Sequence, residues 1–159
     1  MLQMKRAMRE YKVSPVEGHV RESLQEADPG SSVLNEPEAA YVVNRVRDGL
    51  PFEEFHALQE MLGVTEEKMG ALVGMSRATL HRRKKSGFLD RSESDRLVRY
   101  ARVFQTALNF CENEEAAAHW LNRPAMAFGY ETPLDYADTE IGAREVEALI
   151  TRLEYGVAT

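Results

Sequence analysis

Apolar residues recur at helical spacing through most of this chain, and the spacing breaks at a few glycines and prolines. One such stretch starts after Glu36-Pro37, where proline suits the first turn of a helix, and ends at Gly49. A second covers residues 52–62 and is closed by Gly63. The pattern therefore predicts a chain of short helices from about residue 35 onward. Residues 1–34 show no sustained apolar period, and we expect a loosely ordered arm there.

The next two predicted helices are joined by a tight turn. A cap with an acidic first turn at residues 65–68 leads into a short helix that ends near Val73-Gly74. Ser76 is placed to cap the following helix, which covers residues 77–85 and stops at Gly87. This order is typical of a helix-turn-helix, in which the second helix presents its N-terminal residues to base edges in the DNA major groove.

The second of these helices is a basic island in an acidic protein. The 159 residues carry a formal charge of -6, yet residues 76–102 hold 9 Lys or Arg against 3 Asp or Glu. Leu80, with Ala78 or the stem of Arg83, would face inward. Such a helix is either a solvated face or a DNA-contacting one, because arginine forks onto guanine and lysine neutralises phosphate. The candidate DNA-binding residues are Ser76, Arg77, Thr79, His81, Arg82, Arg83, Lys84 and Lys85.

The last third of the chain predicts a longer helix followed by a small helical unit. Ser92 or Ser94 would cap a helix of roughly seventeen residues with an apolar stripe. Asn113 would open a shorter helix, and Thr139 would cap a final one whose apolar residues include Ile141. The predicted fold class is all-α, with an arm at 1–34, a helix-turn-helix domain at 35–102 and a second helical domain at 103–159.

Composition limits the kinds of site and activity that we expect of this chain. The single cysteine, Cys111, excludes an internal disulfide, and the four histidines are scattered without metal-ligand spacing, so we expect no metal and no cofactor. The carboxylates of residues 135–147 have no nucleophile and base arranged beside them, which argues against an enzyme. No apolar run suits a membrane helix or a signal peptide, and a cytoplasmic location is expected.

Several short motifs occur together in the second half of the chain. They are Ser94-Asp95-Arg96-Leu97-Val98-Arg99, Ala117-Ala118-His119-Trp120-Leu121-Asn122-Arg123-Pro124, Gly129, Thr132-Pro133-Leu134, Thr139-Glu140-Ile141-Gly142-Ala143 and the stretch from Val146 to Gly156. Taken together, and with the predicted helix-turn-helix before them, they resemble the MbcA/ParS/Xre antitoxin family over roughly residues 50 to 157. The sequence departs from an ordinary Xre recognition helix after Arg82, where a frequent tryptophan is replaced by Arg83; this adds phosphate-binding potential and removes packing.

The resemblance implies an antitoxin that forms an inactive complex with a RES-type, NAD-consuming toxin and represses its own promoter. Operator DNA and the toxin would be its partners, bound by a homodimer and by higher hetero-oligomers. In such families the C-terminal domain grips the toxin, and its last residues approach the NAD cleft. This role transfers to Trp120, Leu134, Arg152, Tyr155, Gly156 and Val157. Packing against the last helix is the simpler interpretation of Trp120, and a stand-alone repressor with a C-terminal association domain is the alternative function.

Overall fold

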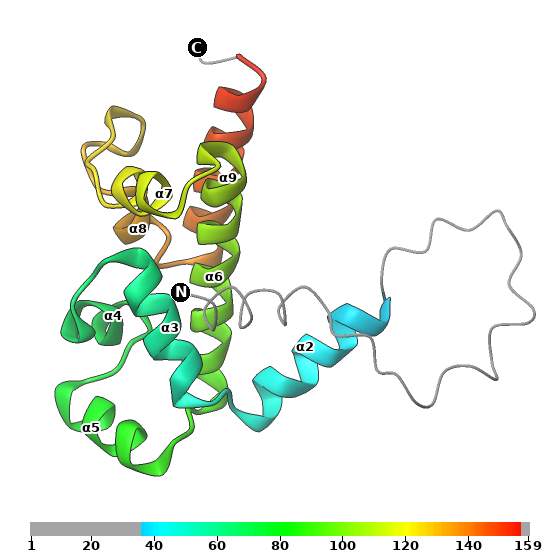
Figure 1. The fold of residues 1–159 in the computed structure, drawn as a ribbon, viewed down its shortest axis with the longest axis vertical. Coiled ribbons are helices and arrows are strands. Elements are labelled where there is room, and N and C mark those ends of the chain that lie inside the picture. Colours follow the sequence, from blue (N-terminus) through cyan, green and yellow to red (C-terminus); the bar gives the residue numbers. More distant parts are fainter. Residues whose placement is uncertain (1–35, 157–159) are drawn as a thin grey trace, which may run out of the picture. The chain divides into compact units, whose positions relative to one another are not determined.

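A computed structural model of the chain describes residues 36–156, and every regular element within them is a helix (Figure 1). An isolated β-bridge pairs Pro51 with Phe88. The all-α prediction is confirmed. The helices are α2 (Glu36–Asp48), α3 (Phe52–Leu62), α4 (Glu66–Leu72), α5 (Arg77–Ser86), α6 (Arg91–Cys111), α7 (Glu114–Leu121), the 3-10 helix η1 (Met126–Phe128), α8 (Pro133–Tyr136) and α9 (Glu140–Glu154).

Helix α2 lies mostly in a first unit, Met1–Arg45, and is described here by itself. It begins at Glu36 and ends before Gly49, as its sequence predicts. The guanidinium carbon of Arg45 lies 5.8 Å from the centroid of the Tyr41 ring, within reach of a cation–π interaction. The arm expected at residues 1–34 falls outside the described residues.

Helix α6 is the central element of the second unit, Val46–Thr159. It has 21 residues, four more than the sequence predicts. Helices α3, α7 and α9 pack against it, and α7 also contacts α3 and α8. Four residues of the expected apolar stripe are fully buried: Leu97, Tyr100, Phe104 and Ala107. Ala101 and Leu108, also expected there, are half-buried, and Val103 is buried although the prediction omitted it. Burial raises the pKa of the Tyr100 hydroxyl to about 12.

The cap of α6 differs from the prediction. Asp90, and neither Ser92 nor Ser94, is the N-cap residue. The Asp90 carboxylate accepts from the Glu93 N–H at 2.8 Å, and the Glu93 carboxylate accepts from the Asp90 N–H at 2.8 Å, which forms a capping box. Ser94 is buried instead; its hydroxyl accepts from the Leu50 N–H at 2.9 Å. Asp90 caps the helix in place of the serines because its own N–H also donates to the Glu93 carboxylate.

Two arginines of α6 bind the start of α9. Arg102 donates from Nη2 to Glu140 at 2.9 Å and from Nε to Glu147 at 2.7 Å. Arg99 donates to the Asp138 carbonyl at 2.6 Å. Ile141, expected among the apolar residues of α9, is 78% exposed because its position in the first turn faces away from α6 and α8. The predicted boundary between residues 102 and 103 falls inside α6, so the two predicted halves share one helix.

Candidate functional site

The turn between α4 and α5 is closed by a side chain from α6. Gly74 has φ +81°, in the left-handed region that favours glycine, and the Met75 N–H donates to the Gly70 carbonyl at 2.7 Å. Arg96 donates from Nη1 to the Val73 carbonyl at 3.0 Å. A Cβ atom on Gly74 would lie 2.0 Å from that Nη1. The positive φ therefore favours glycine here, and a larger residue would also displace the Arg96 guanidinium from the Val73 carbonyl.

Helix α5 begins at a serine cap, as predicted. The Ser76 hydroxyl accepts from the Thr79 N–H at 3.2 Å and donates to the Thr79 hydroxyl at 3.0 Å. Only Leu80 of this ten-residue helix is buried, and Ala78 is exposed. Of the two residues that could have joined Leu80 on the inner face, the structure therefore selects Arg83.

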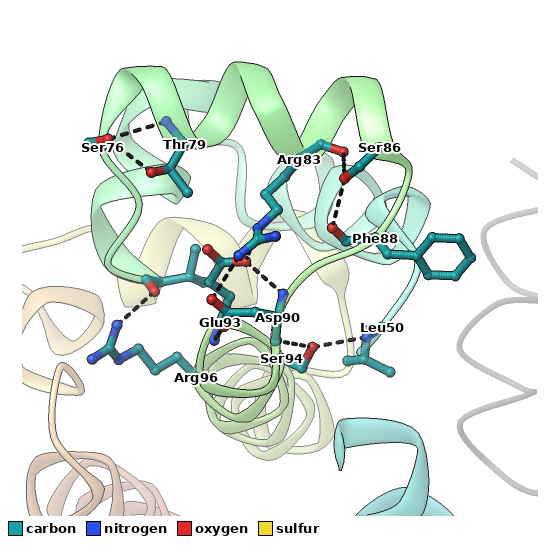
Figure 2. A network of polar contacts seen from close by, with 11 residues as sticks. Leu50, Ser76, Thr79, Arg83, Ser86, Phe88, Asp90, Glu93, Ser94 and Arg96 are labelled. Carbon is teal, nitrogen blue, oxygen red and sulfur yellow. Dashed lines mark hydrogen bonds and ion pairs between the residues drawn. The ribbon is translucent and has the colours of Figure 1, made fainter. Parts of the chain in front are cut away.

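Arg83 is held against the start of α6 (Figure 2). Its Nε donates to Glu93 at 2.7 Å and its Nη2 donates to Asp90 at 2.8 Å. The hydrogen bond to Glu93 raises the pKa of Arg83. Burial pushes the pKa of Asp90 upward, but hydrogen bonds and the Arg83 charge outweigh it and leave that pKa below its usual value. We call Arg83, Asp90 and Glu93 the Arg83 network.

The Arg83 network corrects one sequence-based expectation. Arg83 was expected to add phosphate-binding potential at the cost of packing, yet its side chain is only 20% exposed and two carboxylates neutralise it. Its guanidinium replaces the missing aromatic contact with ionic hydrogen bonds. The residue therefore acts inside the fold.

The remaining basic side chains of α5 point to solvent. Arg77, His81, Arg82 and Lys85 are exposed and form no ion pair within residues 36–156. Lys84 differs, since its ammonium lies 3.1 Å from both carboxylate oxygens of Glu66 at the start of α4. That pair is exposed, and an exposed pair is worth only about 0.2–1 kcal/mol. Lys84 therefore remains accessible to an anionic partner.

The residues assigned to toxin binding lie in three different environments. Leu134 is fully buried in α8 and belongs to the core of the free chain, so its assignment to toxin binding stays a prediction. Trp120 is half-buried on α7. Arg152, Tyr155 and Gly156 are exposed at the end of α9, with Tyr155 75% exposed. Val157 lies outside the described residues.

Sequence reasoning missed an exposed apolar pair on the segment between α7 and α8. Met126 is 79% exposed and Tyr130 is 72% exposed. Both lie between Pro124 and Pro133, in a stretch with no helical period. No sequence signal separates them from Phe128, a third large apolar residue of the same turn, which is buried.

The two ends of the second unit are joined by polar contacts as well as by α6. The Lys68 ammonium of α4 forms an ion pair with Asp135 of α8, and the Asn122 side chain donates to the Leu62 carbonyl at 2.9 Å. In Figure 1, α5 lies at one end of this unit, while the segment after α7 and the last turn of α9 lie at the other. A partner bound at α5 would therefore not cover the end of α9, and a partner bound at the end of α9 would not cover α5.

Within residues 36–156 there is no cluster of three His, Cys, Asp or Glu side chains suited to a metal ion. None of the helices in that range is long and apolar enough to span a membrane. The surface features that remain are the basic face of α5 and the exposed residues at the opposite end.

Comparison with known proteins also divides the chain into a part that contains α5 and a part that contains the end of α9. A family model described as the antitoxin Xre-like helix-turn-helix domain matches residues 42–102, and one described as the antitoxin Xre/MbcA/ParS C-terminal toxin-binding domain matches residues 106–156. A Photorhabdus laumondii protein named Antitoxin Xre is 31% identical over 116 residues, which are 72% of this chain and 78% of that protein. A Yersinia enterocolitica protein of the same name is 29% identical over 118 residues, covering 73% and 80%.

Proposed function

Because this chain belongs to the Xre/MbcA/ParS antitoxin family, we propose that it neutralises a RES-type, NAD-consuming toxin and represses its own operon. The family relation points to a regulatory protein rather than an enzyme. The observation that carries the proposal is the position of the two surfaces. The exposed basic face of α5 and the end of α9 lie at opposite ends of one compact unit (Figure 1).

The DNA-binding part of the proposal rests on α5. Its N-terminus is capped and leads with Arg77, while Arg82 and Lys85 follow on exposed positions. Arginine reads guanine through two hydrogen bonds, and lysine supplies phosphate neutralisation. Two such helices in a homodimer would read half-sites about one DNA turn, or ~34 Å, apart. Toxin binding at the far end would bring further dimers together and raise avidity for the operator.

The toxin-binding part rests on the end of α9. Helix α9 runs to Glu154, and Tyr155 and Gly156 follow it as an exposed turn. We propose that this turn and the residues after it enter the NAD cleft of the toxin and exclude the cofactor. Arg152, exposed in the last turn of α9, would pair with an acidic group or phosphate-binding site at the rim of the cleft. Inhibition by occlusion needs no catalytic residue in the antitoxin.

The test separates the two surfaces in the intact complex. We expect the double variant Arg77→Ala with Arg82→Ala to lose operator binding, measured by fluorescence anisotropy, while it still silences NAD consumption by the toxin. Because two phosphate or base contacts are lost, the slope of log affinity against log salt falls by up to about 2. Asp138→Ala, which removes an exposed charge from the other half, is the matched control and retains both activities.

Deletion of residues 155–159 tests the other surface. Since α9 ends at Glu154, this truncation leaves the helix complete. We expect operator binding to persist and toxin inhibition to fall. Full inhibition by the truncated protein would contradict occlusion by the tail. A wild-type protein that binds operator DNA yet ignores the toxin would instead favour the stand-alone repressor.

A further inference from the structure

The turn at residues 125–131 leaves two large apolar side chains exposed and buries a third. Met126 and Tyr130 are 79% and 72% exposed, while Phe128 between them is 7% exposed. The Phe128 ring stacks on Tyr136 of α8, with centroids 4.6 Å apart and planes at 28°. Phe128 therefore anchors the turn to the fold and leaves its neighbours on the surface.

This turn is ordered by its own backbone. The Ala125 N–H donates to the Glu131 carbonyl at 3.0 Å, and the Ala125 carbonyl accepts from both Phe128 and Tyr130 at 3.0 Å. The two ends of the turn are thus joined to each other. A surface that is already ordered loses little conformational freedom when a partner binds it.

Tyr130 adopts a backbone conformation that is unfavourable for its type. Its φ is +70°, in the left-handed region where a bulky residue is rare and where glycine or asparagine costs less. Within the described residues its side chain has no hydrogen bond, ion pair or ring contact that would offset this cost. Because no such contact within the described residues offsets the strain at Tyr130, contacts with a partner are the candidate source of compensation.

We infer that the 125–131 turn is a docking point for the toxin, with Met126 and Tyr130 entering an apolar pocket on its surface. This inference rests on the proposed toxin-binding function. The turn lies inside the segment matched to a toxin-binding domain, at the same end of the unit as the last turn of α9 (Figure 1). Tyrosine and methionine are enriched in the buried centres of interfaces, and tyrosine is among the commonest hot-spot residues.

Charge specifies the pocket further. Residues 103–159 hold 10 Asp or Glu against 3 Lys or Arg, and Glu131 is exposed directly after Tyr130. A Lys or Arg at the rim of the partner's pocket would therefore pair with Glu131. Charges at such a rim act mainly on the association rate, which falls as salt increases.

The decisive variant is Tyr130→Asn in the full-length protein. Asparagine suits the left-handed conformation, so we expect the thermal unfolding midpoint to equal or exceed that of the wild type. Binding to the purified toxin, measured by titration calorimetry, should weaken by about 30-fold, the loss typical of a hot spot. Tyr130→Phe keeps the ring and should stay within about 3-fold of the wild type.

Ile141→Ser is the matched control, because Ile141 is 78% exposed in the same half of the chain but lies on α9 outside the turn. It should bind the toxin as the wild type does. Equal loss in Ile141→Ser and Tyr130→Asn, or wild-type affinity in Tyr130→Asn, would overturn the inference and leave the proposed function intact. A wild-type chain that does not bind the toxin would refute the proposed function itself.

Discussion

The Arg83 guanidinium lies 2.7 Å from the Glu93 carboxylate, which simultaneously accepts the N–H of the residue that caps α6. One carboxylate thus stabilises the start of α6 and fixes the rotation of α5 about its own axis. Since Leu80 is the sole buried residue of α5, this contact supplies much of what orients the helix. When Arg83 binds Glu93 and Asp90, the other basic side chains of α5 face the solvent.

The effects of Arg83→Ala and Glu93→Gln on the free energy of unfolding should therefore not be additive. Arg83→Ala leaves the buried Glu93 without its cation, and Glu93→Gln leaves Arg83 with Asp90 as its one carboxylate partner. We expect each variant to lower the free energy of unfolding by about 2 kcal/mol. The double variant should cost less than the sum, which urea unfolding of all four proteins would show. Additive losses would mean that the two side chains stabilise the fold separately.

The same variants distinguish orientation from direct phosphate contact. If Arg83 only positions α5, both variants weaken operator binding without changing its salt dependence. Arg82→Ala, an exposed neighbour, should instead lower the salt slope by about 1. A lower slope in Arg83→Ala with normal binding in Glu93→Gln would show that Arg83 contacts DNA.

Gly74→Ala should be more damaging than Gly87→Ala, although both glycines have φ close to +80°. A Cβ atom at residue 87 meets nothing within 4 Å, whereas one at residue 74 meets Arg96. We expect Gly87→Ala to cost about 1 kcal/mol and Gly74→Ala up to about 1 kcal/mol more in thermal unfolding, because Arg96 would move aside and lose its hydrogen bond to the Val73 carbonyl. Arg96→Ala in the Gly74→Ala background should recover part of the difference, because it removes the clash.

Leu134→Ala tests whether that residue packs in the core or binds the toxin. Loss of a fully buried leucine should cost about 2–5 kcal/mol of folding free energy. Operator binding and toxin binding should then decline together as the folded fraction falls. Arg152→Ala, an exposed substitution, should leave the unfolding midpoint unchanged. A Leu134→Ala protein that keeps wild-type stability but loses only the toxin would support the toxin-binding role.

Stability should fall in acid partly through Glu140. Burial pushes the pKa of Glu140 upward, but hydrogen bonds from Arg144 and Arg102 outweigh it and leave that pKa below its ordinary 4.5. The folded state therefore binds fewer protons than the unfolded chain, and the stabilisation is present above pH 4.5 and lost as pH falls through the lowered value. Urea unfolding between pH 6 and pH 3 should show a flatter profile for Glu140→Gln than for Glu145→Gln.

Local signals made much of the fold predictable. The caps at Thr65, Ser76, Asn113 and Thr139 were predictable because each is a hydroxyl or amide side chain directly before a stretch with helical character. The cap of α6 was not, because three candidate residues, Asp90, Ser92 and Ser94, lie within five positions. The Asp90-x-x-Glu93 spacing of a capping box is local and present in the sequence, whereas the burial of Ser94 against Leu50 is tertiary.

The candidate site was predictable as a basic helix but not residue by residue. Composition cannot tell Arg82 from Arg83, since the direction of each depends on where α6 begins. Leu134 was assigned to a surface because motif resemblance marks a position as important without saying whether it packs or binds. The exposed pair Met126 and Tyr130 was missed for the opposite reason: apolar residues are expected inside, and only the backbone of the turn shows that they cannot be.

Helix α6 has a consequence for how this protein is degraded. It supplies core to the basic half and to the acidic half, and Lys68 with Asp135 joins them again. A protease that unfolds or cuts α6 therefore removes both halves in a single event. Under the proposed function, the α5 end and the α9 end would have the same lifetime, so release of the operator and release of the toxin would begin together.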